Sequence, residues 1–322
     1  MTLPNLICVG NAIIDILAKV EDTFLKSYNL YKGSMSLVNN EEFNKIFSQL
    51  SEYKVKSGGS AANTAVGYSS FGGNALFFGS IGQDNFGFSF KKDLNDIGIH
   101  FLSYDDKFVN AETSKSLILV SPDGERTMCT FLDASVSLSL KNFDQSIFKN
   151  DSILYLEGYL FDKNETKQAM IDLCKIARSK GSLICLSLSD SFCVERHKND
   201  FFLLIKNYVD ILFGNDQEIK VLLNGEKKEK VNSIVEIAVI TNGPKGANIF
   251  KENNRIFVPP IHGLNVVDTT GAGDIFAAGF LFGFSRKLTL DDCGKLATQG
   301  ASHIIQHYGA RPVEKLSKFV IS

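Results

Sequence analysis

Short runs of apolar residues alternate with longer amphipathic stretches through the second half of the chain. The short runs lie at 152–156, 183–188, 211–213 and 238–241. The helix-like stretches between and after them span residues 163–180, 201–208 and 216–223. Short runs that are apolar at every position are typical of strands buried on both faces. The alternation therefore predicts a parallel sheet with helices packed against it.

The first half begins with a strand of the same kind. Leu6–Gly10 is an apolar run that ends in glycine, and a second such run lies at 75–81. If the first strand continues, Asn11, Ile13 and Asp15 point to the same side, because side chains alternate along a strand. Polar side chains on an apolar strand need hydrogen-bond partners. A polyhydroxy ligand and a turn satisfy that need equally well, so the pattern leaves both interpretations open.

The rest of the first half is typical of a smaller β structure. Two β-rich runs, 113–120 and 127–132, are joined by the turn Pro122–Glu125, which predicts a hairpin. Residues 16–40 alternate weakly and predict exposed strands and loops. The predicted helices of this half are 41–49 and 86–97.

These elements divide the chain into two parts. We expect an α/β core and a small β-sheet lid whose segments interrupt the core. The core is predicted to comprise residues 1–15, 41–98 and 134–322, and the lid residues 16–40 and 99–133. No segment of about 20–50 residues repeats, which excludes a solenoid.

A glycine-rich turn precedes a helix predicted to reach Phe284. Two β-branched residues lead into Asp268-Thr269-Thr270-Gly271-Ala272-Gly273-Asp274. At a helix N-terminus, unpaired backbone N–H groups and the helix dipole favour an anion. An acid at Asp274, beside such an anion, is suited to take a proton from an attacking group, which predicts phosphoryl transfer. The alternative is a purely structural helix start, where Asp is also common.

A second glycine-rich turn, Gly58–Asn63, opens another predicted helix. Its small residues let the backbone and the Asn63 side chain approach a ligand closely. Neither the dinucleotide fingerprint G-x-G-x-x-G nor the phosphate loop G-x-x-x-x-G-K-[ST] is present. Arg126 follows the hairpin turn, where a lone arginine is more often a surface charge.

Composition narrows the partners and the location. The 322 residues are 44% hydrophobic and 22% charged with a formal net charge of −2, so neither a nucleic-acid nor a membrane-surface partner is expected. Six scattered cysteines and the lack of a basic leader predict buried thiols in a cytoplasmic protein. No apolar run approaches the roughly 18 residues that a membrane span needs. His303 and His307 have the spacing of one helix face but lack a third ligand, which disfavours a metal site there.

Three separated motifs occur in the order and spacing of a known family. Gly58–Asn63, Asn215–Glu218 and Asp268–Asp274 resemble the signatures of the ribokinase-like, or PfkB-type, carbohydrate kinases, and the resemblance covers essentially the whole chain. The D-T-x-G-A-G-D signature is the most specific of the three. Further similarity to the adenosine kinase branch lies in Gly10–Asp15, Arg126–Met128, Thr130–Ser135 and Tyr155–Tyr159. Asp133 departs from that branch, whose members more often have glycine there.

The resemblance implies a fold and a reaction. The fold would be a three-layer α/β/α core with a mostly parallel central sheet and a small β-sheet lid. The reaction would be Mg²⁺- and ATP-dependent phosphorylation of the 5′-hydroxymethyl group of a ribonucleoside, adenosine to AMP first. A kinase for a free sugar such as ribose or fructose is the alternative, and a non-catalytic nucleoside- or sugar-binding regulator is a more distant one. Exposed lid strands would be able to pair two copies as a homodimer.

The resemblance also implies roles for individual residues. Asp274 would be the base, and the backbone N–H groups of Gly271, Ala272 and Gly273 would form the anion hole. Arg126 would reach the transferring phosphate from the lid. The residues implied for acceptor binding are Asn11, Asp15, Gly58, Gly59, Ser60 and Asn63. Those implied for ATP binding are Asn215, Thr241, Gly243, Gly246 and Thr269, while Asn215 and Glu218 would hold Mg²⁺ through water.

Overall fold

The computed structural model describes residues 5–103, 111–141 and 143–320. Within these ranges the larger sheet has nine strands in the order β14-β13-β12-β11-β10-β9-β1-β5-β6. In that order the strands are Asn254–Val258, Ala247–Lys251, Ile237–Thr241, Ile211–Asn215, Leu183–Ser187, Ile153–Glu157, Leu6–Val9, Ala75–Gly79 and His100–Ser103. Neighbouring strands from β12 to β6 are parallel, whereas β13 and β14 pair antiparallel at one edge.

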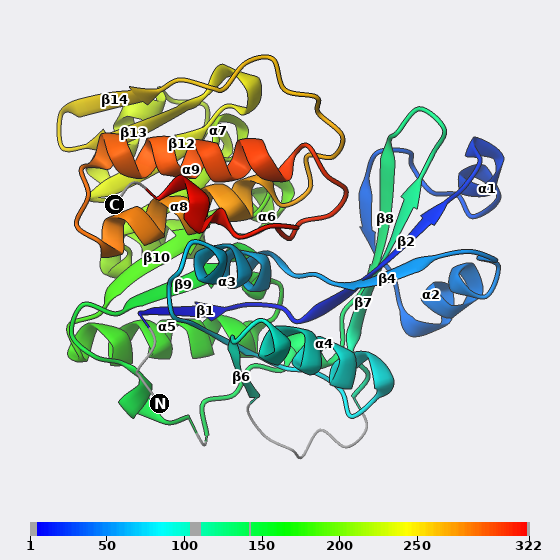
Figure 1. Cartoon of the computed structure of the whole chain (residues 1–322). Helices are drawn as coiled ribbons and strands as arrows, with labels where there is room; N and C mark the ends of the chain where they lie inside the picture. The colour runs from blue at the N-terminus through cyan, green and yellow to red at the C-terminus, as the bar shows by residue number, and fades with distance from the viewer. Residues whose placement is uncertain (1–4, 104–110, 142, 321–322) are drawn as a thin grey trace.

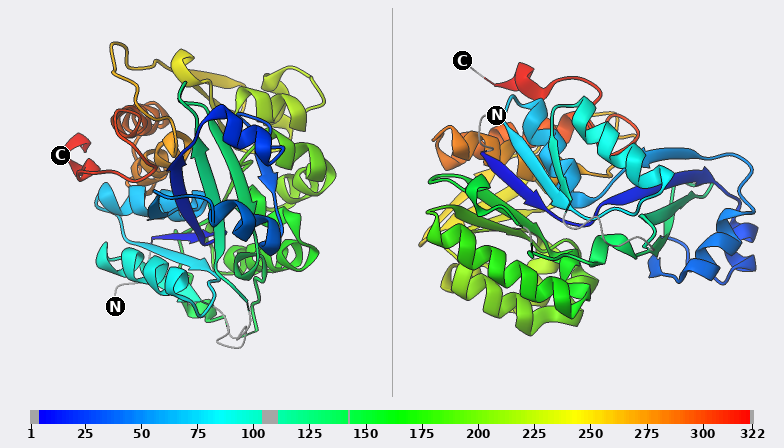
Figure 2. Two further views of the ribbon diagram at one scale, coloured as in Figure 1. Left: turned by 90° about the vertical axis from the view of Figure 1, so that its right-hand side faces the viewer. Right: turned by 90° about the horizontal axis from the view of Figure 1, so that it is seen from below.

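Helices cover both faces of this sheet (Figure 1 and Figure 2). On one face lie α3, α8 and α9, which span Ser60–Ser70, Ala272–Ser285 and Leu290–Ile304. On the other face lie α5, α6 and α7, which span Asn164–Ser179, Ser191–Tyr208 and Asp216–Leu222. Alternate residues of β1 enter the two cores, because Leu6 and Cys8 pack with the first group of helices and Ile7 and Val9 with the second. The predicted three-layer α/β/α arrangement is confirmed.

A smaller five-stranded sheet projects from one side of the larger one (Figure 1). Its order is β3-β8-β7-β2-β4, with the bounds Met35–Leu37, Arg126–Phe131, Ser114–Val120, Ile13–Lys19 and Lys54–Ser57. The predicted hairpin is present as the antiparallel pair β7 and β8. Two helices pack on this sheet, and a third lies between the sheets. These helices are α1 (Asp22–Ser27), α2 (Asn40–Phe47) and α4 (Asn85–Asp96).

The first strand does not continue to Asp15, so the condition under which Asn11, Ile13 and Asp15 would share one side is not met. β1 ends at Val9, and β2 begins at Ile13 in the other sheet. The backbone N–H of Asn11 donates instead to the Glu157 carboxylate, at 2.7 Å from Oε1, which keeps this N–H out of a strand ladder. Ile13 and Asp15 therefore share one side of β2, whereas Asn11 lies in the connection between the sheets.

The division predicted from the sequence also differs from the structure at several places, because β2 begins at Ile13 and α2 packs on the smaller sheet, although 1–15 and 41–98 were expected in the core. β4 belongs to the smaller sheet, because it pairs with β2, although 41–98 was expected in the core. β6 extends the larger sheet beside β5, although 99–133 was expected in the lid. β2 and β4 are separated in the sequence by α1, β3 and α2, so local pattern does not reveal their pairing. β5 and β6 are consecutive strands joined by α4, and their parallel pairing completes a strand–helix–strand unit.

Two further observations concern the whole described chain. All six cysteines are free and buried, as their scattered positions in the sequence predicted. Within the described ranges, none of the helices combines the length and the apolar composition required to cross a bilayer.

Candidate active site

The predicted site residues gather along one edge of the larger sheet. β1, β9, β11 and β12 are parallel, so the segments that follow them leave the sheet at the same edge. Glu157, Asn215 and Thr241 are the last residues of β9, β11 and β12, and Asn11 follows β1. In open parallel sheets, ligands bind at this edge, beyond the carboxyl ends of the strands. The fold therefore brings together motifs that are separated by as many as 200 residues or so in the chain.

The turn before α8 presents backbone N–H groups to the space beyond the carboxyl ends of these strands. Gly271 is the N-cap and adopts a left-handed conformation with φ of 76°. A Cβ atom there would also lie 2.6 Å from the Ala310 Cβ, so two independent constraints require glycine. Among the described residues the Gly271 and Gly273 N–H groups have no hydrogen-bond partner, and a Cβ on Gly273 would meet open space. Such a helix N-terminus suits an anion.

One of the three amides implied for the anion hole is already engaged. The Ala272 N–H donates to the carbonyl oxygen of Thr269 at 3.2 Å. The left-handed residue at Gly271 folds the turn back on itself and closes this bond. The structure thus leaves Gly271 and Gly273, rather than all three residues, with free N–H groups.

Asp274 lies in the first turn of α8, with its carboxylate held by two side chains of α3. Ser60 Oγ donates to Oδ1 at 2.7 Å, and Asn63 Nδ2 donates to Oδ2 at 3.0 Å. Desolvation raises the pKa of Asp274 to about 6, although both hydrogen bonds act to lower it. Burial outweighs these hydrogen bonds, so Asp274 is a stronger base than an ordinary carboxylate and still mainly ionised at neutral pH.

Glu157 is a site residue to which the sequence analysis assigned no role. It is fully buried at the end of β9 and accepts hydrogen bonds from the backbone N–H groups of Asn11 and Ala61, at 2.7 and 2.8 Å. Desolvation raises its pKa to about 7. A Cβ on Gly10 would collide with its carboxylate. Glu157 therefore links the connection after β1 to the start of α3 through these hydrogen bonds. In the sequence, the feature that could have revealed its role is an acidic residue at the end of an apolar strand.

Asn11 and Gly59 pack against each other at this junction. A Cβ on Gly59, whose φ is 88°, would lie 2.3 Å from the Asn11 carbonyl oxygen. The absence of a side chain on Gly59 thus leaves room for the backbone of Asn11. Asn11 Oδ1 is buried and has no partner among the described residues. A buried acceptor without a partner is costly, so this oxygen is available to a hydroxyl of a ligand.

Asp15 is a further acid near the site and lies on β2. A Cβ on Gly58 would meet its carboxylate at 2.2 Å, so Gly58 allows the carboxylate to pack against the backbone. Desolvation raises the pKa of Asp15 to about 7, with the positive charge of Arg311 opposing this rise and the negative charge of Asp274 adding to it. Asp15 is therefore close enough to Asp274 for each carboxylate to affect the ionisation of the other.

Arg126 connects the smaller sheet to the glycine-rich turn. Its Nη2 atom lies 2.5 Å from Oδ2 of Asp268, whose side chain is 1% exposed. Asp268 also accepts hydrogen bonds from the backbone N–H groups of Thr270 and Gly309, at 2.8 and 2.7 Å. Burial raises the pKa of Asp268, but these bonds outweigh that effect and leave the pKa below its usual value. Arg126 is thus held at the site rather than exposed as a lone surface charge.

Some of the residues implied for ATP binding also shape the end of β12 and the turn that follows it. Thr241 ends β12, and the following turn is closed by a 2.8 Å bond from the Asn242 N–H to the Gly246 carbonyl oxygen. A Cβ on Gly246 would lie 2.3 Å from the Val258 carbonyl oxygen. A Cβ on Gly243 would meet no atom within 4 Å. Thr269 is exposed next to the anion site.

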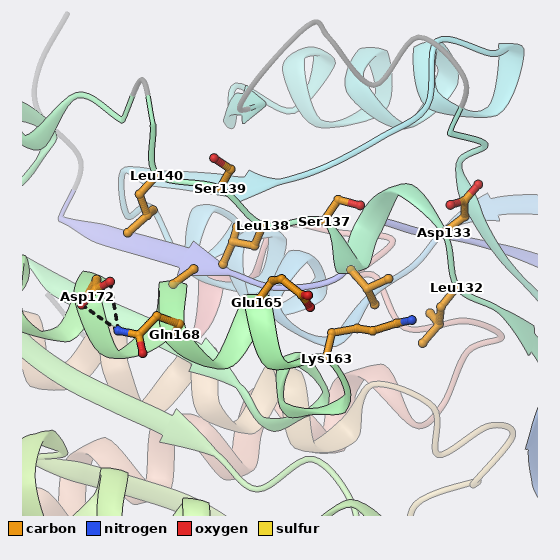
Figure 3. A pocket seen from close by; sticks show the side chains of 12 residues that line it. Leu132, Asp133, Ser137, Leu138, Ser139, Leu140, Lys163, Glu165, Gln168 and Asp172 are labelled. Atoms are coloured by element: carbon orange, nitrogen blue, oxygen red, sulfur yellow. Dashed lines mark hydrogen bonds between the residues drawn. The ribbon is translucent and has the colours of Figure 1, made fainter.

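Two cavities are lined by residues discussed above. One, of about 280 Å³, is lined by Asp15, Arg126, Thr270 and Arg311 among others, so it reaches both sheets and the glycine-rich turn. The other, of about 650 Å³, lies between the segment 132–140 and the start of α5 (Figure 3). Asp133, the departure from the adenosine kinase pattern, lines this second cavity, which contains none of the implied site residues.

Comparison with known proteins shows to which family the chain belongs. The family model for pfkB family carbohydrate kinase matches residues 4–316. The chain belongs to this family. The structure is similar to a probable sugar kinase protein from Rhizobium etli CFN 42, with a TM-score of 0.92 and 37% identity over 99% of this chain and 98% of that one. It is equally similar to adenosine kinase from Sinorhizobium meliloti, with a TM-score of 0.91 and 35% identity over the same shares of the two chains.

Curated relatives include sugar kinases as well. Probable fructokinase-6, chloroplastic, of Arabidopsis thaliana is 28% identical over 257 residues, which cover 74% of this chain and 65% of that protein. The pfkB family assignment and these relatives make the chain a phosphotransferase that acts on an alcohol group of a nucleoside or sugar. ATP with a divalent metal is the phosphate donor that the kinase family implies.

The residues near Asn215 fit a metal that is bound through water. Among the described residues, no group of three or more His, Cys, Asp or Glu is arranged to hold a metal directly. Both carboxylate oxygens of Glu218 accept hydrogen bonds from Asn215, at 3.0 Å from its backbone nitrogen and 2.5 Å from Nδ2. Burial raises the pKa of Glu218 to about 7, so a nearby cation would favour its ionised form. Mg²⁺ is commonly bound by one or two carboxylates together with water and substrate phosphates.

Proposed function

We propose that this kinase uses Mg·ATP to phosphorylate the 5′-hydroxymethyl group of a ribonucleoside, and that adenosine is its acceptor. The observation that carries the proposal is the Asp274 carboxylate, which Ser60 and Asn63 hold beside two free amides at the start of α8. The choice of adenosine is supported by the 35% identity to an adenosine kinase over 99% of the chain and by the segment Gly10–Asp15.

The residues perform the reaction mainly by position and charge. Asp274 accepts the proton of the acceptor hydroxyl as that oxygen attacks the terminal phosphoryl group of ATP. The transition state is loose and spreads negative charge over the equatorial oxygens. The free amides of Gly271 and Gly273 and the guanidinium of Arg126 stabilise this charge. Asn215 and Glu218 would hold Mg²⁺ through water, and there it would supply positive charge to the phosphates of the donor.

The acceptor is bound by side chains of both sheets. Asp15 accepts hydrogen bonds from hydroxyl groups, and Asn11 Oδ1 accepts another. The backbone at Gly58 and Gly59 allows close approach, and Asn63 orients Asp274. When the smaller sheet covers the acceptor, water is excluded and cannot take the phosphoryl group in place of the acceptor.

A sugar kinase is the second candidate function. It is favoured by the probable sugar kinase protein from Rhizobium etli, which resembles this chain as closely as the adenosine kinase does. A non-catalytic regulator is disfavoured, because Asp274 is intact and held by two hydrogen bonds.

A coupled assay of ADP release over a panel of nucleosides and free sugars tests the proposal. With purified protein, Mg²⁺ and ATP, adenosine is expected to give the highest kcat/KM, and ribose and fructose a value lower by about 10²-fold or more. The reason is that a purine contributes binding energy that a free sugar lacks. Turnover of ribose or fructose without turnover of adenosine would replace the nucleoside assignment, and no turnover with any acceptor would remove the enzymatic one.

The pH dependence of kcat/KM for the acceptor tests the role of Asp274. Its pKa of about 6 lies above the usual value, so the base is lost by protonation as the pH falls through about 6. Because kcat/KM reports on the enzyme before the acceptor binds, it is expected to be nearly constant above about pH 7 and to fall about tenfold between about pH 6 and pH 5. Measurement between about pH 5 and pH 8 at constant ionic strength gives this profile. A kcat/KM that stays flat to the lower limit would exclude Asp274 as the base.

A further inference from the structure

Arg311 lies in the segment after α9, coloured red in Figure 1, and the glycine-rich turn holds this segment in place. The Gly309 N–H donates to the Asp268 carboxylate at 2.7 Å. Ala310 packs so closely on Gly271 that a Cβ there would be 2.6 Å away. Lys56 Nζ donates to the Tyr308 carbonyl oxygen at 3.3 Å from the other side. The position of Arg311 is therefore fixed relative to the site.

Two nitrogen atoms of the Arg311 side chain, Nε and Nη2, have different surroundings. Nε donates to Oδ1 of Asn63 at 3.4 Å, and Nδ2 of the same amide donates to Asp274 at 3.0 Å. Since the guanidinium engages the amide oxygen, the amide nitrogen must point toward Asp274. Nη2 of Arg311 is buried and has no hydrogen-bond partner among the described residues. A buried charged donor without a partner is costly, so this atom is poised for a ligand.

The cavity that Arg311 lines is the one that contains Asp15 and Arg126. Asp93 from α4 and Lys56 from β4 also line it, so charges of both signs surround the space. Burial lowers the pKa of Arg311 to about 10, with Asp93 and Asp15 opposing the decrease, so the side chain is protonated at neutral pH. A hydroxyl group donates to a carboxylate and accepts from a guanidinium, and so satisfies both.

We propose that Arg311 is a specificity-determining residue, in which Nη2 donates to a ribose hydroxyl oxygen of the acceptor while Nε holds the Asn63 amide toward Asp274. The proposal rests on the proposed function, because it takes the acceptor to be a ribonucleoside. None of the sequence motifs contains Arg311, and the geometry alone gives it this role.

A cycle of enzyme variant and substrate variant tests the contact with the hydroxyl. Wild type and Arg311→Gln are compared on adenosine, 2′-deoxyadenosine and 3′-deoxyadenosine. The variant is expected to lose about 100-fold in kcat/KM on adenosine, about tenfold from the lost hydrogen bond to the hydroxyl and about tenfold from the lost positioning of Asn63. On one of the two deoxy acceptors it is expected to lose only about tenfold, because the hydroxyl that Arg311 contacts is absent there and only the positioning effect remains. Equal losses on all three acceptors would overturn the contact.

A second measurement tests whether Arg311 positions the Asn63 amide. At saturating adenosine, Arg311→Gln is expected to lower kcat about tenfold, because the Asn63 amide loses its fixed orientation. Arg311→Lys retains the charge but lacks Nε, so it is expected to recover KM more than kcat. An unchanged kcat in Arg311→Gln would remove the positioning part.

Two controls separate these results from misfolding and from failure of the proposed function. Arg286 stacks on Phe282 at the far end of α8, and Arg286→Gln is expected to leave every kcat/KM unchanged. The KM for ATP and the thermal midpoint of Arg311→Gln report on the fold. If the wild type ignores adenosine and phosphorylates a sugar, the proposed function fails on the wild type alone. The cycle is then run with deoxy forms of that sugar, and equal losses on these would overturn the role of Arg311 independently.

Discussion

Replacing Asp274 by asparagine is expected to lower kcat by about 10³-fold or more while KM for ATP changes little. Asparagine has the same size and keeps a hydrogen-bonding partner for Ser60, so the fold at the start of α8 is retained. It cannot accept the proton of the acceptor hydroxyl at neutral pH. Steady-state rates with saturating adenosine measure the effect, and the small residual rate is expected to lose its dependence on a group with a pKa of about 6.

The next helix provides a matched control for this variant. Asp292 is the third residue of α9, as Asp274 is of α8, and its carboxylate is capped by Thr289. Asp292→Asn removes the same charge from the same helix position without touching the site, so kcat is expected to stay within about twofold of wild type. Should Asp274→Asn retain more than about a tenth of the wild-type kcat, Asp274 would be a substrate-orienting residue and the base would have to be sought elsewhere.

The alternation of strands and helices could be predicted from the sequence because it is local. Ser152–Leu156 and Leu183–Leu188 are apolar at nearly every position, and both lie in the central strands β9 and β10. The glycine-rich turn was equally visible, since its residues are contiguous. The pairing of β4 with β2, in contrast, depends on which segments meet in space, and no local pattern encodes it.

The candidate site shows the same limit more sharply. Glu157 bonds Asn11 and Ala61, which lie 146 and 96 residues away, so neither partner could be predicted from its neighbours in sequence. Arg311 and Asn63 are separated by 248 residues. The pKa of Asp274 depends on the burial of the whole site, whereas the sequence revealed only the helix dipole. Contiguous motifs identify a site, but its electrostatics arise from the packing of segments that are distant in the chain.

Replacing Arg126 by alanine is expected to lower kcat by about 10³-fold, because the guanidinium stabilises charge on the transferring phosphoryl group only in the transition state. KM for adenosine is expected to change by less than about fivefold, since Asp15 and Asn63 remain in place. Asp268 stays hydrogen-bonded to Thr270 and Gly309 in this variant, so the turn keeps its shape. Arg126→Lys retains the charge but not the planar fork and is expected to recover only part of kcat.

Another arginine–aspartate pair separates this effect from the loss of an ion pair as such. Arg178 contacts Asp210 at 2.8 Å, and Asp210 precedes β11, at the edge of the sheet opposite to the site. Arg178→Ala removes an arginine–aspartate pair that is more exposed than the pair of Arg126 and Asp268, and its kcat is expected to match wild type. If Arg126→Ala and Arg178→Ala lower kcat equally, Arg126 acts through stability alone. A loss confined to Arg126→Ala, with an unchanged thermal midpoint, would support contact between its guanidinium and the transferring phosphoryl group.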